Sequence, residues 1–299
     1  MGQDANMGHA ISPFHLTPPT CHWKIRIAQR PCCRLFAQSF SMLPSRLHTC
    51  ESLILRSRDH READRILTLL TPDLGRLDVL ARGARKPASR KSGKVEPFML
   101  VRIQLQQSKF LPFVGEVQLL NPFQGCRESL QAIVASSYAC ELVYNLTVEG
   151  EESDLAEEVF GSLITVLTEI DAEPDRPDLP LCWLELHMLS AAGFEPALEF
   201  CVGCGAEARP EPWGFSVAEG GILCPDCLGA MPGGQPLPLE VFKILRFLQR
   251  STWEQVRARR VAQPALSEAR SIMREYLNHT LERPLRTAQF ERRSGRGLK

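Results

Sequence analysis

The chain has 299 residues, and its 35 basic and 35 acidic side chains give a formal net charge of zero at pH 7. A content of 44% hydrophobic and 23% charged residues is typical of a globular protein with a sizeable core. No apolar run approaches the ~20 residues that a membrane helix needs. We therefore exclude an integral membrane protein and expect two or three domains.

The zero net charge conceals a segregation of charge along the chain. Residues 75–94 carry seven basic residues against one acid, whereas residues 149–178 carry eleven acids against the single base Arg176. Basic residues return after Glu282. Because local charge governs the choice of partners, we expect residues 75–94 to meet a polyanion and the acidic stretch to be a solvated surface.

The first 46 residues differ from the rest of the chain. They show neither helical nor strand periodicity, and Asp4 is their only acid. A transit peptide would account for the basic residues before Leu35. A start codon placed too far upstream, with Met42 as the true initiator, would account for them as well. We favour the second explanation, because the ordered pattern begins just after Met42, and predict a disordered or mis-annotated extension over residues 1–46.

Five short strands are predicted between residues 47 and 123. They cover residues 52–56, 63–71, 76–83, 98–106 and 113–120, although the apolar spacing of the second would also suit a short helix. Residues 72–75 are a strong turn signal. Short strands at this spacing, with no long helix between them, indicate a small barrel, so we predict a five-stranded OB fold over residues 47–123.

A loop rich in Gly, Pro, Ser and basic residues, 82–94, follows the third predicted strand. Its composition predicts flexibility, and its charge indicates binding to a nucleic-acid backbone. The alternative is a solubilising surface loop, which fits less well with such dense positive charge without acids. Phe110, Phe113 and Phe98 could offer stacking faces to bases, although such aromatic residues more often belong to a core.

Helical periodicity begins after residue 124. Helices are predicted over residues 129–146, 153–170, 179–192, 238–250 and 265–282. In the first helix, Leu130, Ile133 and Val143 are among the residues expected to face the core. We predict a helical domain over residues 124–285 and a basic tail over residues 286–299, which makes the whole an α+β protein.

Two C-x2-C pairs lie within the helical domain. They are Cys201 with Cys204 and Cys224 with Cys227, and nineteen residues separate the pairs. This spacing suits four thiolates around one zinc ion, and a closed set of protein ligands indicates a structural Zn²⁺ module, over residues 199–230. The alternative, two redox-active motifs, lacks the strand–helix context of the thioredoxin kind. The other seven cysteines show no disulfide framework, which favours a reducing cytoplasm.

Motifs for catalysis are absent from the sequence. It contains no phosphate-binding loop, no dinucleotide-binding glycine motif, no zinc-protease motif and no nucleophile elbow. We therefore predict no catalytic residues and a protein that acts by binding.

The order of these parts resembles the RecO family of bacterial recombination mediators. The resemblance rests on LILRS…EADRILTLLTPDLGRLDVLARGARK (53–86), on LELHMLSAAGFEPALEFCVGCG (184–205) and on the knuckle GGILCPDC (220–227). It is specific where the zinc module and the ARGARK stretch occur together. It implies an N-terminal OB barrel, a helical domain with a four-cysteine zinc module, and no enzymatic activity.

The resemblance also implies a function and partners. A RecO-like protein of the bacterial cytoplasm, associated with the nucleoid, binds single- and double-stranded DNA and anneals complementary strands in DNA repair and recombination. With RecR, it helps RecA to load onto DNA coated by the single-strand-binding protein SSB. No membrane is involved. The DNA contacts would fall on the basic residues of the barrel, which are Arg76, Arg82, Arg85, Lys86, Arg90, Lys91 and Lys94.

The SSB tail is acidic and ends in an apolar group, so it would need an apolar groove with a basic rim. We expect this groove near the helix predicted over residues 238–250, where Lys243, Arg246 and Arg250 would face outward.

Two other functions remain open. OB barrels bind RNA as well as DNA, so a zinc-stabilised RNA-binding protein is the first alternative. An enzyme such as a metal-dependent nuclease is the second, and the missing motifs count against it.

Overall fold

The computed structural model describes residues 46–150, 154–209, 213–281 and 285–287. The chain divides into two units, Met1–Gln38 and Ser39–Lys299, and every described residue belongs to the second. The predicted extension and basic tail therefore lie outside the described residues, apart from Arg46, Arg286 and Thr287. In the described part of the chain, no helix has the length and apolar character of a membrane span.

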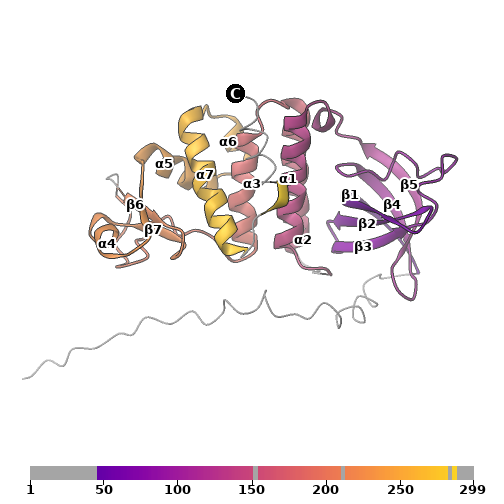
Figure 1. Cartoon of the computed structure of the whole chain (residues 1–299), viewed down its shortest axis with the longest axis horizontal. Helices are drawn as coiled ribbons and strands as arrows, with labels where there is room; N and C mark the ends of the chain where they lie inside the picture. Colours follow the sequence, from indigo (N-terminus) through magenta and orange to yellow (C-terminus); the bar gives the residue numbers. More distant parts are fainter. Residues whose placement is uncertain (1–45, 151–153, 210–212, 282–284, 288–299) are drawn as a thin grey trace, which may run out of the picture. The chain divides into compact units, whose positions relative to one another are not determined.

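The N-terminal part of the described chain forms a closed five-stranded barrel (Figure 1). Its strands are β1 (Leu47–His60), β2 (Asp64–Thr71), β3 (Gly75–Ala81), β4 (Leu100–Gln106) and β5 (Phe113–Asn121). They are hydrogen-bonded in the order β1-β2-β3-β5-β4, and β1 closes the barrel by pairing with both β2 and β4. The predicted OB-like barrel is confirmed, and the segment that could have been helical is strand β2.

Alternation of apolar and polar residues decides which side of each strand faces the barrel interior. In β4, Val101, Ile103 and Leu105 are fully buried, whereas Arg102 and Gln106 are exposed. A pleated strand places successive side chains on opposite faces, so this pattern fills the interior with aliphatic groups.

Strand β1 pairs with two neighbouring strands because it bends along its length. Its first half pairs with β4 and its second half with β2, and the register with β2 shifts between Ile54 and Arg56. A bulge of this kind increases the local twist, which lets one strand complete a small barrel.

The C-terminal region is mainly helical. Its longer helices are α1 (Leu130–Leu146), α2 (Asp154–Ala172), α3 (Asp178–Ala191), α5 (Leu239–Arg250) and α7 (Gln263–Thr280). Each begins and ends close to a helix predicted from periodicity. The 3-10 helix η3 (Gly125–Arg127), before α1, and the short helix α6 (Trp253–Arg257), after α5, were not predicted.

The predicted inward face of α1 is wrong in its first turn. Leu130 and Ile133 are 56% and 39% exposed, whereas Tyr138 is fully buried. The rest of the buried stripe is made largely of small residues, among them Ala132, Ala135, Ser136 and Ala139. Small side chains let α2 and α3 approach α1 closely, so helix packing selects this stripe over the larger apolar residues.

The barrel and the helical region share one apolar core. Leu53, Leu55 and Leu70 of the barrel belong to the same buried cluster as residues of α1, α2 and α3. Helix α1 contacts β1, and α2 contacts β2 and β3. The two regions are therefore packed against each other by burial of aliphatic side chains.

Arg127, in η3, adds polar contacts across the same boundary. Its guanidinium donates to the carbonyl oxygens of Pro97, Pro122 and Phe123, and it lies 5.4 Å from the ring centroid of Phe98. Pro97 lies near the end of the long connection between β3 and β4, and Pro122 follows β5. One side chain thus fixes two barrel segments against the start of the helical region.

The carboxylate of Glu141, on α1, ties down the last described residues. It accepts hydrogen bonds from the backbone N–H groups of Arg286 at 3.1 Å and Thr287 at 2.9 Å, and from the Thr287 hydroxyl at 2.6 Å. Leu285 is only 4% exposed and belongs to the main core. Residues 285–287 are therefore part of the helical region.

A buried polar cluster joins α1, α3 and α7. The Tyr138 hydroxyl donates to Glu185 at 2.7 Å, and the Arg270 guanidinium lies 3.8 Å from the same carboxylate and pairs with Asp178. Glu185 is fully buried and Arg270 is 4% exposed. Burial, reinforced by the charge of Glu185, raises the pKa of Tyr138 well above its usual value, so its hydroxyl stays protonated and donates.

We expect Glu185→Ala to lower the free energy of unfolding by about 3–5 kcal/mol, because the substitution leaves Arg270 buried without this carboxylate. Urea unfolding followed by circular dichroism measures the change. Glu157→Ala removes an exposed carboxylate from α2 and is the control, with an expected change below about 0.5 kcal/mol. An equally small effect of both substitutions would contradict a stabilising role for the cluster.

Candidate metal centre and nucleic-acid interface

A three-stranded sheet that was not predicted from the sequence supports the cysteine cluster. It consists of β6 (Trp213–Ser216), β7 (Gly221–Leu223) and β8 (Gly234–Leu237), in the order β7-β6-β8, and the short helix α4 (Pro225–Ala230) follows β7. All residues of β6 and β7 are buried. Strands this short do not show a clear alternation of apolar and polar residues, which is why the sequence pattern missed them.

The four cysteines are brought together by two short backbone structures. Cys201 and Cys204 lie in a tight turn, closed by a hydrogen bond of 2.8 Å from the Gly205 N–H to the Cys201 carbonyl. Cys224 immediately precedes α4, and Cys227 lies in its first turn. The two structures are those expected for a pair of zinc knuckles.

The distances between the thiols fit a single metal ion. The Sγ atoms of the four cysteines all lie within 4.8 Å of one another, and those of Cys204 and Cys224 are 3.6 Å apart. Tetrahedral zinc with Zn–S bonds of about 2.3 Å places its sulfurs ~3.8 Å apart. The predicted ligand set, Cys201, Cys204, Cys224 and Cys227, therefore forms one cluster with the dimensions of a closed four-thiolate site.

Two glycines beside the cysteines are required by this geometry. Gly205 has φ +77°, a conformation that residues with a side chain rarely adopt. A Cβ atom at Gly203 would lie 2.8 Å from the Cys227 sulfur and 2.9 Å from the Met231 sulfur. A side chain at either position would disturb the placement of the ligands.

The surroundings of Cys201 favour its thiolate, which is the form that binds a metal ion. Burial tends to raise the pKa of Cys201, but hydrogen bonds from the N–H groups of Cys224, Cys204 and Gly203 outweigh it and lower this pKa to about 6. A hydrogen bond with the Cys224 side chain raises the pKa of Cys227 to about 12, so binding of a metal ion there would release a proton.

A second group of ligand-type side chains, His48, Cys50 and Asp73, lies in the barrel and was missed in the sequence. Alternation along β1 places the first two on one face, and the turn before β3 adds the third. His48 Nε2 is 2.6 Å from Asp73, and Cys50 Sγ is 3.5 Å from the Ser52 hydroxyl. Burial raises the pKa of Cys50 to about 11, so its thiol stays protonated. These contacts account for the group without a metal.

Residues 82–94, called the basic segment below, are ordered by a succession of turns. The N–H groups of Lys86, Ser89, Ser92 and Lys94 each donate to the carbonyl three residues earlier, at 2.9–3.1 Å. The start of the segment is anchored by a hydrogen bond of 2.8 Å from the Gly83 N–H to Asp64. The segment thus has a defined turn structure, where composition alone predicts a flexible loop.

Two of the predicted DNA-binding cations in the basic segment are held by the barrel. Arg85 lies 3.5 Å from the carboxylate of Asp59, and Lys91 donates to the carbonyl of Val114 at 2.5 Å. Burial, together with the positive charge of Arg82, lowers the pKa of Lys91. These two side chains have roles within the barrel.

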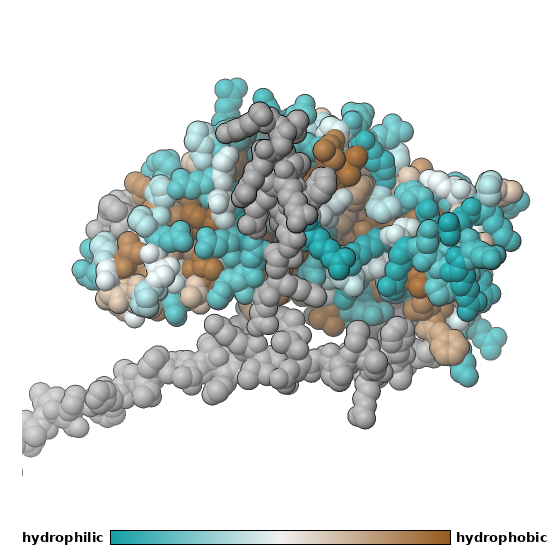
Figure 2. Space-filling view, viewed as in Figure 1, coloured by the Kyte–Doolittle hydropathy of each residue, from teal (hydrophilic) through white to brown (hydrophobic). Residues whose placement is uncertain are grey.

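The other cations of the basic segment differ from these two. The Arg82 guanidinium stacks over Phe113, 3.6 Å from the ring centroid. Within the described part of the chain, Lys86, Arg90 and Lys94 form no ion pair with an acid. Hydrophilic residues cover most of the barrel surface on the face that Figure 2 shows.

Arg76 lies apart from the basic segment. Its guanidinium is 4.4 Å from the ring centroid of Tyr144, on α1, and Arg56 lies over the same ring at 3.9 Å. The Gly150 N–H donates to the Arg76 carbonyl at 3.0 Å. The structure therefore places Arg76 at the boundary between barrel and helices, away from the other predicted DNA contacts.

The three aromatic residues considered for stacking have different environments. Phe98 is 8% exposed and belongs to the core, and Phe113 is half-buried beneath Arg82. Phe110, in the connection between β4 and β5, is 78% exposed.

The cations expected on α5 lie on its outer side, but acids neutralise part of their charge. Lys243 pairs with Glu240 at 2.8 Å, and Arg250 pairs with Glu199. The Arg246 guanidinium lies 5.5 Å from the ring centroid of Phe242, also on α5, and has no acidic partner among the described residues.

The metal cluster and the basic segment are separated by the helices. In Figure 1, β6, β7 and α4 lie on one side of α3 and α7, and the barrel lies on the other side of α1 and α2. The cysteine cluster therefore belongs to the helical region and does not adjoin the basic segment.

Two family models match this chain, and together they span nearly all of its described residues. The model described as Recombination protein O N terminal matches residues 45–123, and the one described as Recombination protein O C terminal matches residues 127–289. The first covers the barrel and the second covers the helical region with its cysteine cluster.

Curated proteins named DNA repair protein RecO are similar over most of their length. The one from Roseiflexus sp. (strain RS-1) is 39% identical over 245 residues, which cover 82% of this chain and 85% of that protein. The one from Desulforudis audaxviator (strain MP104C) is 35% identical over 245 residues, covering 82% and 96%. The one from Anaeromyxobacter dehalogenans (strain 2CP-C) is 34% identical over 240 residues, covering 80% and 93%. With its barrel, its helical region and its four-cysteine cluster, the chain belongs to the RecO family of DNA repair and recombination proteins.

Proposed function

We propose that this protein is a DNA-binding recombination mediator of RecF-type repair. It binds single- and double-stranded DNA, anneals complementary strands and, together with RecR, helps RecA to load onto DNA coated by SSB. The observation that carries the proposal is the basic segment, whose Lys86, Arg90 and Lys94 have no acidic partner among the described residues. Cations of this kind are available to phosphates, and their binding releases counterions from DNA.

The proposed mechanism needs binding and no bond cleavage. Two complementary strands repel each other through their phosphates, and a protein that neutralises part of this charge lets the strands approach and pair. The turns that order the basic segment support this role, because cations on an ordered backbone lose less conformational entropy when they bind. The family also supports it, since the relatives are named for DNA repair.

We also propose that Cys201, Cys204, Cys224 and Cys227 hold one structural zinc ion. Four thiolates complete a tetrahedral shell, so the ion would stabilise the fold around it and would leave no position for substrate. The spacing of the sulfurs and the lowered pKa of Cys201 support this assignment. Since metal binding and local folding are linked, the sheet β6–β8 would depend on the ion.

We expect the purified protein to contain about one zinc ion per chain, and Cys204→Ser to reduce that content strongly, because one of four ligands is lost. Mass spectrometry of the metal content measures it. A strong chelator should also lower the midpoint of thermal unfolding. Cys50→Ser, in the barrel, is the control and should leave the zinc content unchanged. Equal zinc content in the two variants would refute the assignment.

We expect the triple variant Lys86→Ala, Arg90→Ala and Lys94→Ala to weaken binding of duplex DNA and to reduce its salt dependence. If each cation contacts one phosphate, the slope of log K against log salt should become less steep by about 2–3. Fluorescence anisotropy at several salt concentrations measures both quantities. The same variant should anneal SSB-coated complementary strands more slowly.

The matched control changes the same number of exposed cations on the helical region, with Arg257→Ala, Arg259→Ala and Arg260→Ala. An equal loss in the two triple variants would mean that overall charge, and not the basic segment, determines binding. Preference for RNA over DNA of the same sequence would instead favour the alternative function, a zinc-stabilised RNA-binding protein.

For the SSB tail we propose the surface of α5 with Lys243, Arg246 and Arg250. Because Lys243 and Arg250 already pair with acids, Arg246 should contribute most to an acidic peptide. We expect Arg246→Glu to weaken binding of a peptide with the acidic, apolar-ended character of that tail by at least about tenfold, and Lys243→Glu to weaken it less. Isothermal titration calorimetry measures both affinities. If both variants bind the peptide as tightly as the unaltered protein does, this surface is excluded.

A further inference from the structure

The connection between β4 and β5, residues 107–112, carries an aromatic ring that the mechanism above leaves unused. Phe110 is 78% exposed, more than any other large hydrophobic residue described in the chain. The Lys109 ammonium lies 5.9 Å from its ring centroid. Covering an apolar ring that is exposed to water is favourable, so this ring is a candidate for contact with a partner. The adjacent cation indicates that the partner is negatively charged.

This connection is joined to the base of the basic segment. The Leu80 N–H, at the end of β3, donates to the Pro112 carbonyl at 2.8 Å. Arg82 stacks over Phe113, and Lys91 donates to the Val114 carbonyl at 2.5 Å. The exposed ring and the proposed phosphate-binding cations therefore come from two chain segments that meet at one region of the barrel.

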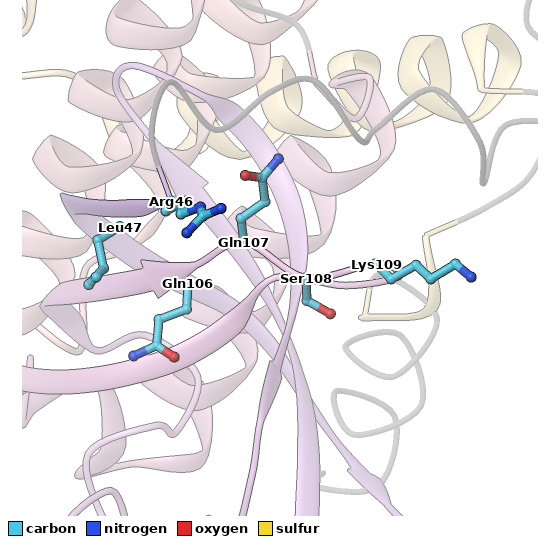
Figure 3. A pocket seen from close by; sticks show the side chains of 6 residues that line it. All are labelled: Arg46, Leu47, Gln106, Gln107, Ser108 and Lys109. Atoms are coloured by element: carbon cyan, nitrogen blue, oxygen red, sulfur yellow. The ribbon is translucent and has the colours of Figure 1, made fainter.

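An open depression of about 550 Å³ lies beside the same connection, at the start of β1 and the end of β4 (Figure 3). It is lined by two cations, three uncharged polar residues and one leucine, and by no acid. These residues are Arg46, Leu47, Gln106, Gln107, Ser108 and Lys109. In Figure 3, Gln106 and Gln107 point to opposite sides of the chain, and Arg46 lies next to Gln107.

We propose that the β4–β5 connection is a subsite for single-stranded DNA, in which Phe110 stacks on an unpaired base. Lys109 and Arg46 bind the neighbouring phosphates. This inference rests on the proposed DNA-binding function and assigns the single-strand contacts to the β4–β5 connection, next to the basic segment.

The chemistry distinguishes single strands from duplex. In a duplex both faces of every internal base are covered by its neighbours, so an aromatic side chain has no base face to stack on. In a single strand these faces are accessible, and stacking on an aromatic residue is tolerant of sequence because every base has a π-face. Lys86, Arg90 and Lys94 contact phosphates, which both forms carry, so only the Phe110 subsite should separate them.

The test measures binding of the full-length protein to a labelled oligonucleotide of about 20 nucleotides and to its duplex, at one salt concentration. We expect Phe110→Ala to weaken binding of the single strand at least about fivefold, at the lower end of what loss of one stacked base costs. Duplex binding should change less than about twofold. Phe110→Trp should retain single-strand binding, because it keeps an aromatic face. Leu130→Ala, which truncates another exposed apolar residue, should change neither.

Each other outcome is informative. Unchanged single-strand binding by Phe110→Ala, or an equal loss for both forms of DNA, would overturn the subsite while leaving the DNA-binding function intact. Absence of binding to either DNA by the unaltered protein would instead remove the proposed function itself. If Phe110→Ala abolishes self-association of the DNA-free protein in sedimentation velocity and leaves single-strand binding unchanged, the ring is covered by a second copy of the chain, and the subsite is overturned.

Discussion

The placement of the basic segment depends on the contact between the barrel and the helical region. Leucines from both sides belong to one core, and Arg127 donates to carbonyl oxygens of Pro97, Pro122 and Phe123 at the boundary. A charged donor gives stronger hydrogen bonds than a neutral one, about 1.5–3 kcal/mol each. Because Pro97 lies near the end of the connection that carries the basic segment, the contact that joins the two regions also fixes this end of the connection.

The connection is held at several other points along its length. Its start is fixed by the hydrogen bond from Gly83 to Asp64, and Glu96, near its end, pairs with Arg65 at 2.5 Å. Between them, successive turns leave few residues free to rearrange. The cations therefore project from a backbone whose entropy has largely been lost on folding, which separates this segment from a flexible basic tail of the same charge.

The cysteine cluster lies in a different part of the molecule. It adjoins the short sheet β6–β8, whose Trp213 and Phe215 are buried in the core of the helical region. Phe215 packs edge-to-face against Tyr276 of α7, with ring centroids 5.9 Å apart. If the proposed zinc ion is bound there, its loss should loosen the helical core first and reach the barrel only through the helices. The proposed sites of metal binding and of DNA contact are therefore separate.

Sequence periodicity predicted the barrel strands and the long helices, because their buried faces repeat over many residues. The C-x2-C spacing predicted that the four cysteines cluster, because each pair is local in the chain. Periodicity failed where long-range packing decides the outcome. On α1, packing against two helices selected Ala132 and Ala139 over Leu130. The strands β6–β8 are too short for a pattern, and β6 pairs both with its close neighbour β7 and with the more distant β8.

The same limit applies to the charge of the basic segment. The sequence counts cations, but only the fold shows which of them already have partners. Arg85 meets Asp59 because the β1–β2 end of the barrel lies beside the segment, and Lys91 reaches a carbonyl of β5. The density of positive charge between residues 82 and 94 therefore overstates the number of cations without contacts to the barrel. The proposed contacts with a phosphate backbone depend on the remaining cations, whose place on the barrel only the fold reveals.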